Sequence, residues 1–375
     1  MKKKTLLITL LSVSLLFGCS SQETTVSSKK QDSYSNTSLE EVFDTVYSFK
    51  EYTEDTDLAE AHFKASEKEL QNYTQLFDIY NNYDGINNLK TINDNAGKEA
   101  VEVDQSIIDM LNLAKDFYDY SDGEFDITIG SLLKVWHEYR EEGIALNEEG
   151  KKGKVPSKSE LEEAAQYKGW QHIHIDEENN TVYIDDENIS LDVGGIAKGY
   201  AAELTTQTMM NTGMTCGILN VGRNIRLIGS KDNPWTVGIT DPLGEYTNGL
   251  VILSLDNDAS VVTSGDYERY YEAEDGKRYP HIVDPATMYP ARYYRSVSII
   301  TEDSGIADCL STALFTMTIE EGENLLNTIK EKTGKDVDAV WIMDPETVQE
   351  YKNSETVGDY VVAYTDGLEG HITWN

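Results

Sequence analysis

The chain has 375 residues, of which 67 are acidic and 31 are basic, and its formal net charge is −36 at pH 7. A surface this acidic repels nucleic acids and anionic membranes, so the composition argues against a nucleic-acid-binding protein. The hydrophobic fraction of 39% allows a sizeable core. An anionic ligand would have to be held by local groups, such as a metal ion, a few Lys or Arg side chains, or backbone N–H groups.

Residues 1–18 have the pattern of a targeting segment. Three lysines precede an apolar run over residues 5–17, and Gly18 and Cys19 follow directly. This order resembles a bacterial lipoprotein signal peptide, which would be removed before Cys19 and leave that cysteine lipidated. An uncleaved signal anchor is the weaker alternative, because the apolar run is short for a membrane span of about 20 residues. Lipidation predicts a protein anchored to the cell membrane and facing outside the cytoplasm.

The rest of the chain is expected to form a tether and one domain. Residues 19–37 are rich in Ser, Thr, Gln and Lys, which predicts a flexible tether. Residues 38–375 contain no further linker and no internal repeat, and they are interpreted as one catalytic domain. Cys216 and Cys309 lie in this domain and could form a disulfide in an oxidising compartment, although the sequence does not establish that bond.

Helices and strands are mixed along this domain without a regular alternation. Helical spacing predicts helices over residues 57–83 and 106–120, and Ser157 with Glu160 predicts a capping box at the start of a third helix. Because no βαβ rhythm is present, we expect an α+β fold with mixed, mostly antiparallel sheets and packed helices. Short apolar or alternating runs predict strands over residues 172–175, 181–184, 189–193, 217–221, 235–239, 251–255 and 295–300.

A glycine-rich junction follows the run at 189–193. Gly194 and Gly195 separate this expected strand from a helix that begins near Ile196. Glycines allow close backbone approach, and free N–H groups at a helix start attract anions. Lys198 lies in the first turn, where a cation is unfavourable against the helix dipole, which suggests a compensating anion such as a phosphate. An ordinary corner with a surface lysine explains the same residues about equally well.

Polar groups gather over residues 261–285. Thr263, Ser264 and Gly265 would place hydroxyls and N–H groups at a strand end, and residues 274–277 carry a hairpin turn signal. Beyond the hairpin lie His281 and Asp284. An imidazole and a carboxylate suit a polar ligand and proton transfer. The alternative is a hydrogen-bonded loop without chemistry.

The segment 301–318 has the apolar stripe of a helix, with Asp308 and Thr312 one turn apart on another face. A carboxylate and a hydroxyl on one face can supply two oxygen ligands to a hard cation such as Mg²⁺. On these residues alone, a solvated Asp and a Thr bonded to its own backbone are the more common explanation.

Taken together, these segments resemble the ApbE family of FAD:protein FMN transferases, a family of lipoproteins. The order and spacing of the family's segments hold from about Asp44 to Trp341. The matching pieces are Phe125–Thr128 after Asp122-Gly123, LDVGGIAKGYAAE at 191–203, SVVTSGDYERYYE at 260–272, HIVDP at 281–285 and ADCLSTALFTM at 307–317.

The resemblance implies an enzyme that binds FAD, uses Mg²⁺ (or Mn²⁺) at its diphosphate and transfers FMN to a Thr or Ser hydroxyl of another protein, releasing AMP. It implies metal ligation by the side chains of Asp308 and Thr312 and the carbonyl of Gly195, with Lys198 beside the phosphates. His281 and Asp284 are the expected proton acceptors. The nucleotide pocket is expected to include Phe125, Asp126, Thr128, Gly194, Lys198, Ser264, Gly265 and His281.

Two departures from the family pattern concern the pocket. Arg223 stands where the family often has the second glycine of a pair, and it would either contact phosphate or block part of the cleft. Met288 precedes Tyr289-Pro290 in place of the usual glycine. Two rival functions remain: an FAD pyrophosphatase that gives FMN and AMP with water as acceptor, and a non-catalytic flavin-binding lipoprotein. A solute-binding lipoprotein is weaker, because such proteins show a regular βαβ rhythm.

Overall fold

The computed structural model describes residues 33–38 and 41–375. The predicted signal peptide, Cys19 and most of the predicted tether lie outside the described residues. The last part of the predicted tether is corrected: Tyr34–Thr37 forms strand β1, which pairs antiparallel with β2 (Tyr47–Glu51). A polar sequence can pair on one side at a sheet edge, so its composition alone did not distinguish this strand from a tether.

A nine-stranded sheet forms the centre of the domain, and all its paired strands are antiparallel. This arrangement confirms the predicted α+β class. After β1 and β2 the strand order continues with β6 (Gly217–Val221), β7 (Asn224–Ile228), β10 (Ala259–Gly265), β13 (Ser296–Thr301), β14 (Asp338–Met343), β16 (Tyr360–Tyr364) and β15 (Ser354–Val357).

Both faces of this sheet are covered. On β13, Ile299 belongs to the core shared with the helices, whereas its neighbour Ile300 belongs to a second core that contains Trp235. Successive side chains of a strand point to opposite faces, so the second core covers the other face of the sheet. That core is completed by a three-stranded sheet in the order β17 (Ile372–Trp374), β9 (Val251–Leu255) and β8 (Trp235–Ile239).

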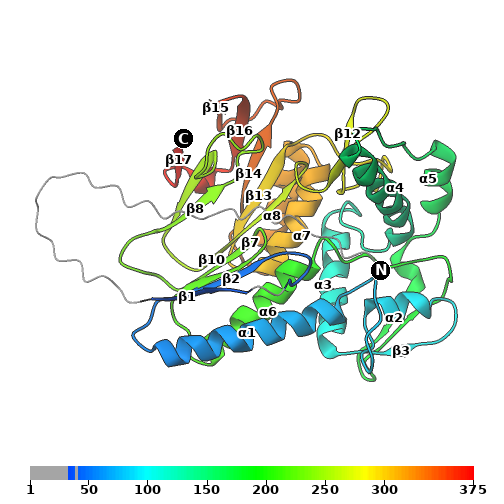
Figure 1. Cartoon of the computed structure of the whole chain (residues 1–375), viewed down its shortest axis with the longest axis horizontal. Coiled ribbons are helices and arrows are strands. Elements are labelled where there is room, and N and C mark those ends of the chain that lie inside the picture. The colour runs from blue at the N-terminus through cyan, green and yellow to red at the C-terminus, as the bar shows by residue number, and fades with distance from the viewer. Residues whose placement is uncertain (1–32, 39–40) are drawn as a thin grey trace, which may run out of the picture. The chain divides into compact units, whose positions relative to one another are not determined.

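Helices pack on the opposite face of the large sheet (Figure 1). Helix α7 (Ser304–Thr316) packs on β10 and β13, and α6 (Ala197–Asn211) packs on β6, β7 and α7. This pair of crossing helices brings two sequence-distant segments together. Further helices are α1 (Thr56–Leu76), which lies against α6, α2 (Leu89–Asp94), α3 (Gln105–Tyr120) and α8 (Ile319–Thr333).

A smaller core joins α4 (Gly130–Glu148) and α5 (Lys158–Ala164) to the hairpin of β11 (Tyr270–Glu272) and β12 (Arg278–Pro280). Trp136 of α4 stacks on Tyr279 at 5.4 Å between ring centroids. The remaining elements are the sheet of β3 (Val101–Glu102), β5 (Thr181–Ile184) and β4 (Ile173–Asp176), and the short helices η1 (Trp170–His172) and η2 (Asp366–Leu368).

The capping box at Ser157 and Glu160 is confirmed. The strand predicted over 189–193 is wrong, because this extended segment makes only a single bridge, between Ser190 and Ile129. The side chain of Asn93 accepts from the Leu191 N–H and donates to its carbonyl, at 2.8 and 2.9 Å. A side-chain amide therefore satisfies the backbone where a neighbouring strand would otherwise be needed.

The first helix was predicted over residues 57–83, but the observed helix ends earlier. Helix α1 ends at Leu76, because the Asp78 carboxylate accepts from the N–H groups of Tyr80 and Asn81. Such a local bond offers the backbone an alternative to the helix.

The cysteine pairing is not formed. Cys216 and Cys309 are both buried free thiols, and they belong to the two different cores of the large sheet.

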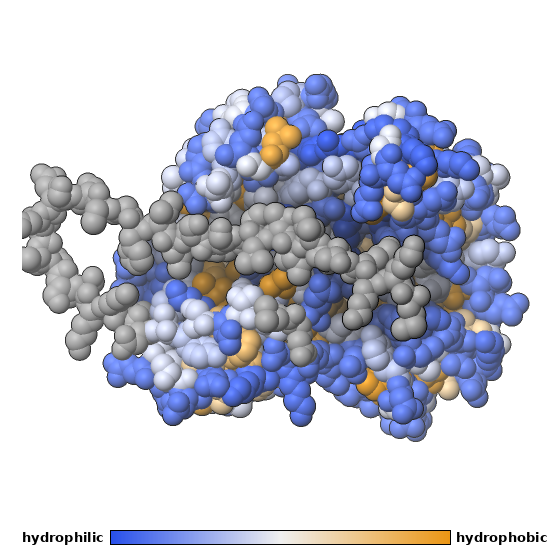
Figure 2. Space-filling view, viewed as in Figure 1, coloured by the Kyte–Doolittle hydropathy of each residue, from blue (hydrophilic) through white to orange (hydrophobic). Residues whose placement is uncertain are grey.

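The visible face of the molecule is largely hydrophilic (Figure 2), in keeping with its 26% charged residues. Within residues 33–38 and 41–375, no helix combines the length and hydropathy that a membrane-spanning segment needs.

Candidate active site

A cavity of about 580 Å³ collects residues from widely separated parts of the chain. Although the chain is strongly acidic, four basic side chains lie on its wall: Arg140, Lys198, Arg223 and Arg269. Of the residues predicted from sequence, those on the wall are Phe125, Asp126, Gly194, Gly195, Lys198, Ser264, Gly265, His281, Asp308 and Thr312.

The glycine corner and helix α7 meet at this cavity. A Cβ atom on Gly195 would lie 3.0 Å from Oγ1 of Thr312 and 3.1 Å from the Phe125 ring. A side chain at position 195 would therefore crowd the Thr312 hydroxyl, and glycine permits this close approach. Residues 195 and 312, distant in sequence, lie side by side as the resemblance implied.

Asp308 links the two helices. Its Oδ2 accepts from the Gly199 N–H at 2.7 Å, and the residue is 3% exposed. A Cβ on Gly199 would lie 2.2 Å from the Ser304 carbonyl oxygen and 2.5 Å from Cβ of Asp308, so only glycine allows α6 and α7 to cross here. The Gly199 N–H, in the first turn of α6, therefore donates to the Asp308 carboxylate. This N–H group is not free for a ligand, although the sequence predicted unpaired N–H groups at the start of this helix.

The oxygen groups here fit a hard cation. Asp308 has no Lys, Arg or His within ion-pair distance among the described residues, and a buried carboxylate without such a partner is costly. Its carboxylate, the Thr312 hydroxyl and the Gly195 backbone border the same cavity. Within the described part of the chain, no group of three or more His, Cys, Asp or Glu could hold a metal ion. The oxygen groups of Asp308, Thr312 and Gly195 would suit Mg²⁺, because this ion binds few protein oxygens and keeps places for water and phosphate.

Lys198 extends along the wall from α6. Its Nζ lies 3.3 Å from Oδ1 of Asn224, the first residue of β7. Since an amide carries no charge, the ammonium group keeps its full charge toward the cavity. This position suits a phosphate.

His281 lies on the cavity wall with its Nδ1 buried and without a hydrogen-bond partner in the structure. Burial and, to a lesser extent, the positive charges of Arg140, Arg269 and Lys198 together lower the pKa of His281 to about 3. The imidazole is therefore neutral at physiological pH, and its low pKa makes it a weak proton acceptor in the free protein.

A side-chain hydrogen bond joins the end of β10 to α7. Oγ of Ser264 lies 2.9 Å from Oγ of Ser311, and a Cβ on Gly265 would meet the Tyr267 ring at 2.8 Å. The Ser264–Ser311 contact places the end of β10 beside the helix that carries Asp308.

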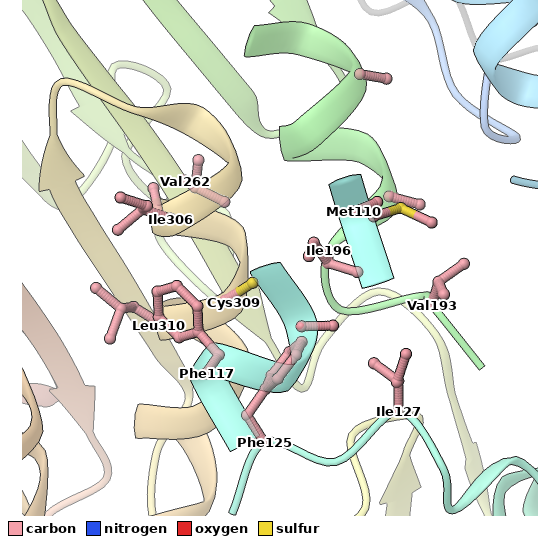
Figure 3. Packing of buried hydrophobic residues seen from close by; sticks show 14 of the residues in the cluster. Met110, Phe117, Phe125, Ile127, Val193, Ile196, Val262, Ile306, Cys309 and Leu310 are labelled. Carbon is pink, nitrogen blue, oxygen red and sulfur yellow. The ribbon is translucent and has the colours of Figure 1, made fainter. Parts of the chain in front are cut away.

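The Phe125 segment forms another part of the wall. Phe125 is buried between α3 and α7, with its ring 6.1 Å from that of Phe117 in an edge-on arrangement (Figure 3). Cys309 lies in the same packed group (Figure 3). Asp126 borders the cavity, and burial raises the pKa of its carboxyl.

Two predicted site residues do not border the cavity. Thr128 is fully buried: its hydroxyl donates to Asp126 at 2.7 Å and accepts from the Gly169 N–H at 2.9 Å. Asp284 is 6% exposed, and its Oδ1 accepts from the N–H groups of Ala286 and Thr287. Both groups make hydrogen bonds within local loops, and the pocket role of Thr128 and the catalytic role of Asp284 stay predictions.

Several residues on the wall were not predicted. Asp192 lies within the glycine-rich segment, so its place could have been found there. Tyr80, His137 and Arg140 gave no signal, because they occur among other polar residues of a turn and of helix α4. Arg269 lay inside a segment already noted, but its partners were unknown.

The structure decides the place of Arg223. Its Nε bonds Glu268 at 2.5 Å, its Nη1 donates to the Tyr267 hydroxyl at 2.7 Å, and its guanidinium lies 4.8 Å from that ring's centroid. The side chain therefore joins the β6–β7 turn to the loop after β10 at the cavity wall.

Comparison with known proteins settles the family. The model of the ApbE family matches residues 43–337, which is most of the chain. The chain belongs to the ApbE family. ApbE relatives named FAD:protein FMN transferase include one from Treponema pallidum, 33% identical over 70% of this chain and 72% of its own, and one from Klebsiella pneumoniae, 31% identical over 67% and 73%.

Solved ApbE structures have the same fold. The ApbE protein of Thermotoga maritima is 29% identical with a TM-score of 0.72, and the flavin transferase ApbE of Vibrio cholerae is 20% identical with a TM-score of 0.69. Each alignment covers 91% of this chain and 99% of the other.

Proposed function

We propose that this ApbE protein is an FAD:protein FMN transferase that moves FMN from FAD to the hydroxyl of a Thr, or a Ser, on an acceptor protein and releases AMP. The observation that carries the proposal is the meeting of Asp308, Thr312 and Gly195 at one cavity wall beside Lys198. A hard-cation set next to a basic side chain suits a dinucleotide diphosphate. The names of the relatives support the same activity.

The proposed reaction is a displacement at phosphorus. The acceptor oxygen forms a bond to the FMN phosphorus, the bond from that phosphorus to the bridging oxygen breaks, and AMP leaves with the bridging oxygen. The proton of the acceptor hydroxyl passes to a base. His281 is the candidate on the wall, because the negative charge of a bound diphosphate would raise its pKa from the low value of the free protein.

Charge and position supply the rest. Lys198 would orient the diphosphate, and Phe125 and Gly265 would shape the nucleotide pocket. A Mg²⁺ or Mn²⁺ ion held by Asp308, Thr312 and the Gly195 carbonyl would neutralise negative charge on the diphosphate.

One assay tests the proposal. Protein, FAD, Mg²⁺ and a candidate acceptor are incubated, and flavin fluorescence is followed on a denaturing gel. We expect fluorescence to remain with the acceptor, and Asp308→Asn to reduce labelling by about 100-fold or more, as for loss of a key electrostatic group. Asp336→Asn, an exposed carboxylate outside the cavity, should label normally. Free FMN without labelled acceptor would favour hydrolysis, and full labelling by Asp308→Asn would contradict the metal-centred mechanism.

We also propose that the chain is a lipoprotein anchored through Cys19 on the outer side of the cell membrane. This rests on the pattern of residues 1–19, which lie outside the described residues. The acceptor would then be a membrane-associated or secreted protein on the same side.

A further inference from the structure

Arg140 is a cation of the cavity wall that lacks a close anionic partner. It lies on α4, its side chain is 13% exposed, and burial lowers the pKa of the guanidinium. Within the described residues, its one ion-pair contact is Glu141, at 3.9 Å, and that carboxylate is 61% exposed. A contact this long to a solvated group gives little compensation for a buried charge.

A neutral neighbour holds the guanidinium in place. Nη2 of Arg140 lies 2.8 Å from Nδ1 of His137, one turn earlier on α4. Arginine can only donate hydrogen bonds, so His137 must accept through an unprotonated Nδ1. The His137 ring packs in turn against Tyr80, with centroids 5.1 Å apart. These contacts fix the direction of Arg140 without neutralising it.

Other charges converge on the same region. Arg140, Arg269 and Lys198 line the same cavity as His281, and the positive charge of each lowers the pKa of this imidazole. The carboxylate of Asp192 also attracts Arg140, but no ion pair joins them and its Oδ1 accepts from the Gly194 N–H at 2.9 Å. Arg269 has its own carboxylate partner, Asp44, at 3.8 Å. Within the described residues Lys198 has no ion pair, and Arg140 has only the long contact to Glu141.

We propose that Arg140, held by His137, binds the diphosphate of the dinucleotide directly, from the side of the cavity formed by α4. The inference rests on the proposed function for its ligand and adds a recognition residue to it. A guanidinium can bond two phosphate oxygens at once, so it orients a diphosphate as well as attracting it. Asp308 and Thr312 would bind the ligand from α7, and Arg140 would bind it from α4.

The test separates anion binding from flavin binding. ADP and riboflavin are titrated by calorimetry into the full protein, with EDTA present so that no metal contributes. Arg140→Met should weaken ADP binding about tenfold or more, since a charge-assisted bond is lost, and should leave riboflavin binding unchanged. Arg140→Lys should fall between, because it keeps charge without the planar fork.

A matched control is Arg278→Met. Arg278 also has a carboxylate at 3.9 Å, on Glu272, and lies outside the cavity, so ADP binding should not change. Equal thermal unfolding of the variants shows that folding is intact. ADP binding by Arg140→Met at the wild-type level would overturn the inference. If the wild-type protein failed to label any acceptor while Arg140→Met lost ADP binding, the transferase proposal would fall and the inference would stand.

Discussion

At the scale of single residues, Asp308 serves both structure and site. One carboxylate oxygen bonds the Gly199 N–H, which holds α6 against α7, and the same group faces the cavity. A substitution here therefore changes two things. Asp308→Asn keeps the shape and an oxygen that can accept from Gly199, so its effect reports mainly on the lost charge.

His281 gives a prediction for pH dependence. Its pKa is lowered to about 3 from an ordinary value of 6.5, so the unfolded chain binds a proton there at a higher pH than the folded chain. Stability must then fall as pH drops below 6.5, by up to about 2 kcal/mol between pH 7 and 5. His281→Gln should lose correspondingly less, as measured by urea unfolding at both values.

The same shift predicts the activity profile. Since His281 stays neutral in the free enzyme, kcat/KM for FAD should show no acid-side fall centred near pH 6.5 from this group. His371→Gln, outside the cavity, serves as control for both measurements. A stability profile identical in His281→Gln and wild type would contradict the assigned environment.

At the scale of elements, the site depends on the crossing of α6 and α7. Gly199→Ala would push a methyl group against the Ser304 carbonyl and Cβ of Asp308. We expect a loss of about 1–3 kcal/mol in unfolding free energy, because neither helix can move without disturbing the core. Gly305→Ala is the milder comparison, since its methyl would come no closer than 3.3 Å to another heavy atom, and the two variants are compared by urea unfolding. Equal losses would mean that the crossing is not tightly constrained.

A second prediction at this scale concerns Arg223, which joins the β6–β7 turn to the loop after β10. Arg223→Gly would release the loop that carries Glu268 and Arg269 from the β6–β7 turn. Since the ion pair is partly exposed, we expect a modest rise of about two- to fivefold in KM for FAD, with kcat little changed. Steady-state kinetics checks this, and Arg278→Gly is the control. A tenfold fall in KM would instead mean that Arg223 blocks the cleft.

At the scale of the whole molecule, the location of the protein can be tested. Cys19→Ala should abolish incorporation of labelled palmitate and shift the protein from the membrane fraction to the soluble fraction after lysis. Cys216→Ala should keep the label, because Cys216 is a buried thiol. Label that persists in Cys19→Ala would contradict the lipoprotein proposal.

Much of the fold follows from local pattern. The strands at 181–184, 217–221, 235–239 and 251–255 have the predicted bounds, since their alternating or apolar runs are bordered by turn residues. The segment at 189–193 was wrongly predicted as a strand. Its apolar residues indicate burial, but burial does not specify which groups form hydrogen bonds with the backbone. The side chain that does so, Asn93, is far away in sequence.

Some of the candidate site residues could likewise be predicted from local patterns, and others could not. Motif spacing indicated Gly195, Lys198, Asp308 and Thr312, because groups within one turn or one helix face are related by local geometry alone. It could not place Arg140, whose role depends on which charges lie opposite. Nor could it show that the side-chain hydrogen bonds of Asp284 are confined to its own loop. Residue types and spacings thus specified the chemistry available to this protein. The tertiary structure decided which groups face one another and which remain without a partner. It did so by bringing α4, α6 and α7 to one cavity, because contacts between distant segments form only when the chain has packed.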